Sequence, residues 1–465
     1  MLAMVMVAAI VTQDATPLRA AARETAAKQT LLYAGDWLEL RGERQGWLSV
    51  YDHRHERPGY VRPAQVRTFA VDETSARDLA AVVDFVRDQS GMEALGIGLT
   101  ALFLRAAPAN AVGPELFDAL GTLAERLARR ASSKWARPND ASLAGQIEVA
   151  QSYGVKFRSF EREGRARICY DGEAYRRVLA MAASPAAKAR AALGLTDPAC
   201  NDVALPVADQ ETLAAWQAAV LESVETATLP AWLSNRLRIR LASRRAEVAY
   251  GKARHGDWAG ARSEGASAER ALALIDKPEL ADEDALAYDE SAVRVGAVRW
   301  AGEEARPNKA VTIAAGKPGQ TCVGFGGVEH CTYAVVWPGS IRVSPRGDVV
   351  TLAQSPLTAW TELVLLRRGQ KESTTLAPAA VDPELGYVEF AGWSPDGAHL
   401  LVAREARMTG PLGQAGTLAP WIQKSFEIRR ADGLTIEKQA SRLDNFVSFR
   451  RWQSPDWRRV TLALR

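Results

Sequence analysis

The feature that most constrains this chain is a change in apolar periodicity along its length. Between Asp72 and about Trp300, apolar residues recur three and four positions apart, as in Leu79, Val82 and Val83. That spacing is the period of one helical face, whereas the segments before and after it carry short β-type runs broken by turns. The chain therefore has to fold as at least three unlike modules.

The 465 residues, 47% of them hydrophobic, are enough for two to four domains with buried cores. We therefore predict a multidomain α+β protein. The expected parts are an apolar segment over 1–10, a small β-barrel over 11–69, a helical domain over 71–303 and a β domain built from repeats over 304–465.

The barrel module carries recognisable motifs between its turns. In order, they are YAGDWLEL at 33–40, GWLSV at 46–50 and PGYV at 58–61. This order resembles the bacterial SH3 family, and the resemblance implies an SH3-like barrel that recognises its ligand through aromatic side chains. Some of its aromatic residues have to be core, but all are candidates for ligand binding: Tyr33, Trp37, Trp47, Tyr51 and Tyr60.

The helical module has two local features of its own. The alternating segment near 155–170 turns at Glu163-Gly164, which predicts a β-hairpin ahead of a helix that starts near Gly172. Further on, Ala246–Leu274 carries small residues and a Gly-Asp-Trp corner between two helices, and it is similar to a single tetratricopeptide repeat. Antiparallel helix pairs also converge on small contact residues without belonging to that family.

One helix face of this module is strongly basic, since its arginines are spaced four apart. Such a face offers a surface for an acidic partner, and the alternative is a solvated face paired with local glutamates. The candidate residues are Arg236, Arg240 and Arg244.

The C-terminal module contains an internal repeat in which a Ser-Pro turn precedes an apolar run. The copies begin at Ser344, Ser394 and Ser454, and the runs that follow the first two are Val349–Ala353 and Leu400–Ala403. The phrase WSPDG at 393–397 resembles the WD40-like repeat of TolB-type β-propellers. Three copies are too few for a propeller of four or more blades, so we expect an incomplete propeller-like domain.

An incomplete propeller leaves strand edges to be covered. The third copy feeds the apolar run Val460–Leu464 at the end of the chain, and Ala310–Ala314 and Thr332–Trp337 are candidates for a return pairing. Because open apolar edges invite aggregation, we expect the helical domain, a second copy of the chain or another partner chain to cover them.

Four cysteines fall in two neighbouring pairs, which predicts the disulfides Cys169–Cys200 and Cys322–Cys331. Disulfides suit an oxidising compartment, so we expect a periplasmic or secreted protein. The alternatives are free buried thiols, or a metal site formed by Cys322, His330 and Cys331, which lacks a nearby fourth ligand.

The N-terminal run Met1–Ile10 is apolar and ends in small residues, without a preceding lysine or arginine. It has the character of the second half of a signal peptide whose beginning lies upstream of this start, or of a buried first strand. No later segment has the composition of a transmembrane helix.

No catalytic motif is recognisable, because G-x-S-x-G, H-E-x-x-H and Walker A sequences are all lacking. Of the five histidines, His53 and His55 alternate in a charged loop, where an exposed hairpin tip is favoured over a metal site. We therefore expect no catalytic residue, metal or cofactor. A formal charge of +3 does not favour nucleic acid or an anionic membrane as partner.

The function we expect is non-catalytic binding or scaffolding in the bacterial cell envelope, with an envelope protein or a peptidoglycan peptide as the partner. The rival hypothesis is a cell-wall hydrolase or transferase that uses carboxylates of the helical domain. A buried, mutually close pair of carboxylates that opens onto a cleft would favour the rival.

Overall fold

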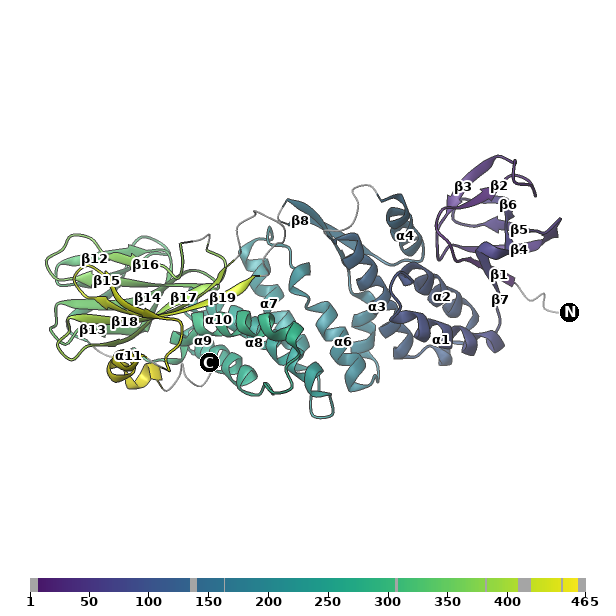
Figure 1. The fold of residues 1–465 in the computed structure, drawn as a ribbon. Coiled ribbons are helices and arrows are strands. Elements are labelled where there is room, and N and C mark those ends of the chain that lie inside the picture. Colours follow the sequence, from purple (N-terminus) through teal and green to yellow (C-terminus); the bar gives the residue numbers. More distant parts are fainter. Residues whose placement is uncertain are drawn as a thin grey trace. The chain divides into compact units, whose positions relative to one another are not determined.

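The computed structural model describes residues 7–133, 140–162, 164–305, 308–380, 383–408, 420–444 and 446–458. It is a mixed α+β chain with several antiparallel sheets, and it divides into two compact units (Figure 1). Unit 1 is the chain up to Leu205 with Val224–Thr226, and unit 2 is Pro206–Ser223 with the chain from Ala227. The helices expected as one domain over 71–303 therefore belong to two units.

Unit 1 begins with a seven-stranded antiparallel sheet in the order β3-β2-β6-β5-β4-β1-β7. The strands are β1 (Val7–Val11), β2 (Thr16–Arg19), β3 (Lys28–Leu32), β4 (Trp37–Arg44), β5 (Trp47–Asp52), β6 (Arg57–Val61) and β7 (Val66–Ala70). The small barrel expected over 11–69 is not closed in the described residues, because the edge strands β3 and β7 do not pair with each other. The apolar run at the N-terminus contributes β1, which pairs with both β4 and β7.

The sheet curls around a core to which every one of its strands contributes. Alternate side chains point inward, as the pleat of a strand requires. The buried set is Ala9, Val11, Leu18, Leu32, Leu38, Leu48, Val50, Val61 and Val66. The curled sheet thus encloses the kind of core expected of a small barrel while its edges stay open.

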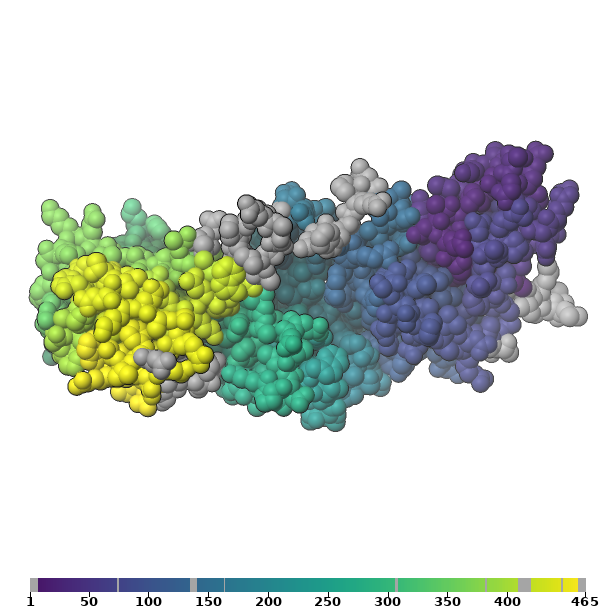
Figure 2. All heavy atoms as spheres, viewed as in Figure 1, coloured from purple at the N-terminus to yellow at the C-terminus, as the bar shows by residue number. Residues whose placement is uncertain are grey.

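After the sheet, unit 1 continues with six described α-helices. They are α1 (Glu73–Arg87), α2 (Glu93–Ala106), α3 (Pro114–Ala131), α4 (Ala141–Ser152), α5 (Glu173–Ala180) and α6 (Pro185–Leu195). Polar caps fix several helix starts: the carboxylate of Asp72 accepts from the Ser75 amide at 2.9 Å, and that of Asp140 accepts from Leu143. In the space-filling view the sheet and the first helices meet along a continuous surface (Figure 2).

The predicted β-hairpin is present between α4 and α5, with strands β8 (Phe157–Arg162) and β9 (Arg165–Tyr170). The helix after it begins at Glu173 with Gly172 as its cap, as predicted. The predicted Cys169–Cys200 disulfide ties β9 to the short 3-10 turn Pro198–Cys200.

The helices of unit 2 pack through small side chains. They are α7 (Val207–Glu222), α8 (Ala231–Arg254), α9 (Trp258–Ala273) and α10 (Ala285–Ala297). Buried alanines on α8, such as Ala246 and Ala249, belong to one core with Ala261 and Ala268 of α9. Small contact residues let two helix backbones approach closely, which explains the alanine-rich composition of this segment.

The β part of unit 2 contains a three-stranded and an eight-stranded sheet. The smaller sheet is β10 (Val311–Ala315), β11 (Thr321–Phe325) and β12 (Val328–Thr332). The larger consists of two meanders, joined where β15 and β17 pair in parallel over two residues. Its strands are β13 (Val335–Val343), β14 (Val349–Leu357), β15 (Trp360–Arg367), β16 (Thr374–Leu376), β17 (Gly386–Trp393), β18 (His399–Met408), β19 (Trp421–Arg430) and β20 (Ile436–Ala440).

The first two Ser-Pro turns each connect the first and second strands of a meander. The Ser344 hydroxyl accepts from the Val349 amide at 3.1 Å, and the Ser394 hydroxyl accepts from the His399 amide at 2.9 Å. Gly397 adopts φ +67°, the left-handed conformation that the turn requires. The first two copies of the sequence repeat therefore form equivalent turns with the same hydroxyl-to-amide hydrogen bond.

The third copy differs in the described residues. A short helix, α11 (Val447–Trp452), precedes Ser454, whose amide donates to the Ala391 carbonyl at 2.7 Å. The strand expected over Val460–Leu464 lies outside the described residues. Among the described helices, none combines the length and the apolar character needed to cross a bilayer.

The Cys169–Cys200 bond closes the longer of the two disulfide loops, at a sequence separation of 31 against 9. Replacing Cys169 and Cys200 with alanine should lower the free energy of unfolding of unit 1 by about 3–4 kcal/mol, because the unfolded chain regains loop entropy. Denaturant unfolding followed by circular dichroism measures this. The matched control, alanine at Cys322 and Cys331, should leave the unit 1 transition unchanged; an equal loss in both variants would contradict the assignment.

Candidate functional site

Unit 1 has a cleft of about 540 Å³ between the sheet and two of its helices. The sheet contributes the start of β4 and the turn after β5, and the helices contribute the second half of α2 and the end of α4. The lining residues are Asp36, Trp37, His53, Arg54, Ala101, Leu102, Leu104, Arg105, Ser152 and Tyr153. Its volume lies within the range of small-molecule and short-peptide sites.

A close backbone contact sets the distance between the sheet and α2. Gly35 adopts φ +96°, and a Cβ added at Gly98 would lie 2.3 Å from the Gly35 carbonyl oxygen. Only glycine at both positions allows this approach. The phenol of Tyr153 bridges the same turn, donating to the Gly35 carbonyl at 2.6 Å and accepting from the Trp37 amide at 3.0 Å. Burial raises the pKa of Tyr153 well above its usual range, so the phenol keeps its proton.

An ion pair between Asp36 and Arg54 forms part of the cleft lining. The Asp36 carboxylate accepts from Arg54 at 2.9 Å and from the Tyr33 amide at 2.8 Å, and its side chain is 3% exposed. The second guanidinium nitrogen of Arg54 lies 3.7 Å from Glu148. Burial raises the pKa of Asp36 to about 6, although Tyr33 and Arg54 act in the opposite direction. Two guanidinium nitrogens of Arg54 thus face carboxylates of the protein itself.

An imidazole and a guanidinium lie against the indole of Trp37. The His53 ring stacks on it at 5.1 Å between centroids, and the Arg105 guanidinium carbon lies 4.7 Å from the indole centroid. His53 also pairs with Glu39 at 2.9 Å. No ion pair joins Arg105 to a carboxylate within the described part of the chain, so its charge is available to an anion entering the cleft.

Of the five aromatic candidates, Trp37 alone lines this cleft. Tyr33 packs on α4, where a Cβ at Gly145 would lie 2.4 Å from its ring. Trp47 is 3% exposed and Tyr51 is partly buried. The Trp47 ring is covered by Arg62 and the Tyr51 ring by Arg41, with centroid distances of 3.9 and 4.2 Å.

Tyr60, the fifth, is partly buried in β6, opposite Ser49 of β5. The ring faces at Trp37, Trp47 and Tyr51 thus support cations rather than forming open stacking platforms. Sequence reasoning did not single out Arg54, Arg105 and Tyr153. The charged loop that holds Arg54 was a usable signal, whereas nothing in the spacing of α2 marked Arg105.

The basic helix face predicted as a partner surface belongs to α8 of unit 2. Arg236 pairs with Asp284 at 2.8 Å and with Glu283. Arg244 is not available to a partner, because it is 5% exposed and pairs with Glu247 at 2.8 Å. Arg240 also has an interaction partner. For Arg236 and Arg244, pairing with nearby carboxylates of the same unit therefore fits better than a surface for an acidic partner.

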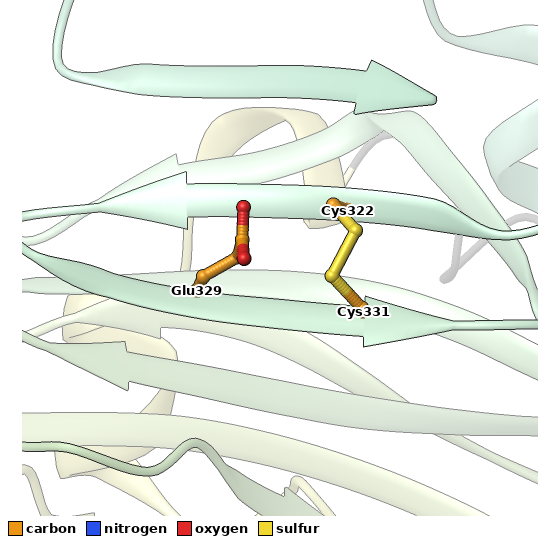
Figure 3. A group of neighbouring side chains, drawn as sticks. All are labelled: Cys322, Glu329 and Cys331. Atoms are coloured by element: carbon orange, nitrogen blue, oxygen red, sulfur yellow. A yellow bond between two sulfur atoms is a disulfide. The ribbon is translucent and has the colours of Figure 1, made fainter. Parts of the chain in front are cut away.

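The cysteines of unit 2 form the predicted Cys322–Cys331 disulfide across the pair β11 and β12, with Cα atoms 4.0 Å apart. Glu329 lies beside it on the same face (Figure 3), and the three residues are close enough to suggest a metal site. The oxidised sulfurs are not thiolates, which removes two ligands from that set. His330 instead hydrogen-bonds Ser373 and Gln354.

Three buried carboxylates of unit 1 are engaged with arginines. Asp36 is the one carboxylate among the ten lining residues, and it pairs with Arg54. In the helices, Glu93 pairs with Arg130, and Asp118 pairs with Arg190 at 2.5 Å. The cleft thus lacks the second carboxylate, opening onto the same space, that the rival hypothesis requires.

Comparison with known proteins adds no identification: no protein family, no curated protein and no solved structure matches the chain.

The raised pKa of Asp36 has a consequence for stability. Between its ordinary pKa of 3.8 and about 6, the unfolded chain releases this proton while the folded chain keeps it. The stability of unit 1 should therefore fall as the pH rises from about 4 to about 6, by roughly 2 kcal/mol, and level off above that.

Asp36→Asn should remove this part of the pH dependence, because an amide does not titrate. The charged and titratable neighbours Arg54, Asp52 and His55 stay in place. Denaturant unfolding between pH 4 and pH 7 measures the slope. The control is Asp84→Asn on the exposed side of α1, which should keep the wild-type slope; identical slopes in wild type and Asp36→Asn would refute the assignment.

Proposed function

We propose that this protein is an exported binding protein whose unit 1 cleft holds the C-terminal end of a peptide. The observation that carries this proposal is the guanidinium of Arg105, held over Trp37 and not paired with a carboxylate in the described residues. An arginine donates two parallel hydrogen bonds to a carboxylate, which makes it well suited to bind a chain terminus.

The rest of the lining supports a ligand with a small apolar body next to its charge. Ala101, Leu102 and Leu104 of α2 form one wall of the cleft, and Leu104 is 41% exposed. A C-terminal residue with a small aliphatic side chain combines these properties. Envelope proteins and the peptides of peptidoglycan both present such ends, and the bacterial SH3 resemblance of residues 11–69 supports that choice.

The two disulfides support export of the protein, independently of the cleft. Two disulfides, Cys169–Cys200 and Cys322–Cys331, are consistent with an exported protein. The repeats of unit 2, which resemble TolB-type WD40-like repeats, suit a second recognition or scaffolding surface. We infer no catalytic step, and the single carboxylate in the cleft does not favour the carboxylate-based hydrolase.

The test is calorimetric titration of the full chain with a tripeptide ending in alanine, compared with the same peptide carrying a C-terminal amide. The free carboxylate should bind and the amide should bind at least about tenfold more weakly, because hydrogen bonds to charged groups contribute about 1.5–3 kcal/mol. A soluble muropeptide with a free C-terminus distinguishes cell-wall from protein ends.

Arg105→Gln should weaken binding of the free-carboxylate peptide by a similar factor of about ten. The matched control is Arg41→Gln, since Arg41 also lies over an aromatic ring of the sheet but does not line the cleft. Equal affinities for acid and amide, or equal losses in the two variants, would refute the proposed function.

A further inference from the structure

The three-stranded sheet of unit 2 has a free edge at β10. β10 pairs with β11 on one side, and no strand of the described residues pairs with its other side. Four of its five residues are exposed, and Ile313 retains 45% of its surface. Alternate backbone amides and carbonyls of such an edge point outward without a strand partner.

The β10 edge lacks the charged residues and prolines that normally keep an edge strand from pairing with another chain. Its sequence, VTIAA, contains neither a charge nor a proline. By contrast, the edge strand β20 of the larger sheet has Glu437 and Lys438 at its centre, and the edge strand β3 of unit 1 begins with Lys28. Charges within an edge strand oppose the addition of another strand. β10 is therefore the described edge best suited to pair with an extended segment.

The edge is also held rigidly. The Cys322–Cys331 disulfide links β11 to β12, which keeps the register of the sheet to which β10 belongs. On the opposite face, Val323, Phe325 and Val328 are buried in a core shared with β13, β14 and β15. A template that is ordered before binding loses less entropy when a partner strand adds to it.

The charges at the two ends of β10 identify the kind of partner. Lys309 and Lys317 flank the strand, both are exposed, and neither forms an ion pair within the described ranges. A second copy pairing antiparallel about Ile313 would place Lys309 opposite Lys317 of the other copy. The chain's own run Val460–Leu464 has an arginine on either side. Both of these occupants would bring like charges together.

We propose that the β10 edge binds an extended segment of a partner protein that has acidic residues on both sides of a short β-forming stretch. The segment adds as a fourth strand through backbone hydrogen bonds, and its acidic ends pair with Lys309 and Lys317. This surface is separate from the unit 1 cleft and does not depend on the function proposed for it.

The probe is a synthetic fluorescent peptide of alternating valine and threonine with glutamates at both ends, titrated onto the full chain. Two N-methylated versions, each blocking alternate amides, separate strand pairing from general adhesion. One should bind like the parent and the other should lose binding, because only one set of amides faces the template. Hydrogen exchange should show new protection over 311–315. Equal binding by both versions, or binding without that protection, would overturn the proposal.

Charge reversal tests the choice of partner. Lys309→Glu with Lys317→Glu should weaken the glutamate-flanked peptide about tenfold and favour a lysine-flanked one, since two attractive pairs become repulsive. Lys371→Glu with Lys438→Glu is the control of equal net charge and should leave the affinity unchanged. A concentration-dependent dimer with β10 protected, or peptide binding that appears only after residues 460–465 are deleted, would overturn the proposal in favour of a second copy or the chain's own end.

Discussion

The candidate site depends on one backbone contact, the approach of the Gly35 turn to Gly98 of α2. A Cβ at either position would meet a backbone oxygen at 2.2–2.3 Å, so any larger residue would force the sheet and the helix apart. Because Asp36 and Trp37 follow directly in the chain, that contact also places them against the helix. Tyr153 reinforces it from α4 through two hydrogen bonds to the same turn. The close approach of the two backbones thus forms the cleft and fixes the position of Asp36 in it.

Aromatic rings in unit 1 act mainly as supports for cations. Trp37, Trp47 and Tyr51 each carry a guanidinium within 5 Å of the ring centroid. A guanidinium over a ring keeps its charge while losing conformational freedom, so less entropy remains to be lost when it binds an anion. Arg105 differs from Arg62 in this respect, because Arg62 also pairs with Glu24 at 2.8 Å. The same local arrangement therefore holds an ion-paired guanidinium at Trp47, and at Trp37 a guanidinium without a carboxylate partner among the described residues.

Features that depend on local sequence could be predicted, and those that depend on distant contacts could not. The hairpin near 155–170, both disulfides and the Ser344 and Ser394 turns follow from short-range turn and pairing chemistry. The open sheet could not be foreseen, because β1 pairs with the distant strand β7, for example Val11 with Val66, 55 positions further along the chain (66 − 11). Arg105 could not be predicted for the same reason, since the ring it contacts, Trp37, is far away in the sequence.

The two proposed surfaces differ in the polar groups that they offer to a ligand. In the cleft, the proposed binding group is a side-chain charge, and Tyr153 hydrogen-bonds the neighbouring backbone carbonyl of Gly35 and amide of Trp37. At β10, side chains are small and uncharged, and the backbone itself offers the hydrogen bonds. Recognition by the first should depend on a terminal charge, and recognition by the second on extended conformation. A single partner need not satisfy both, which is the property expected of a protein that brings different molecules together.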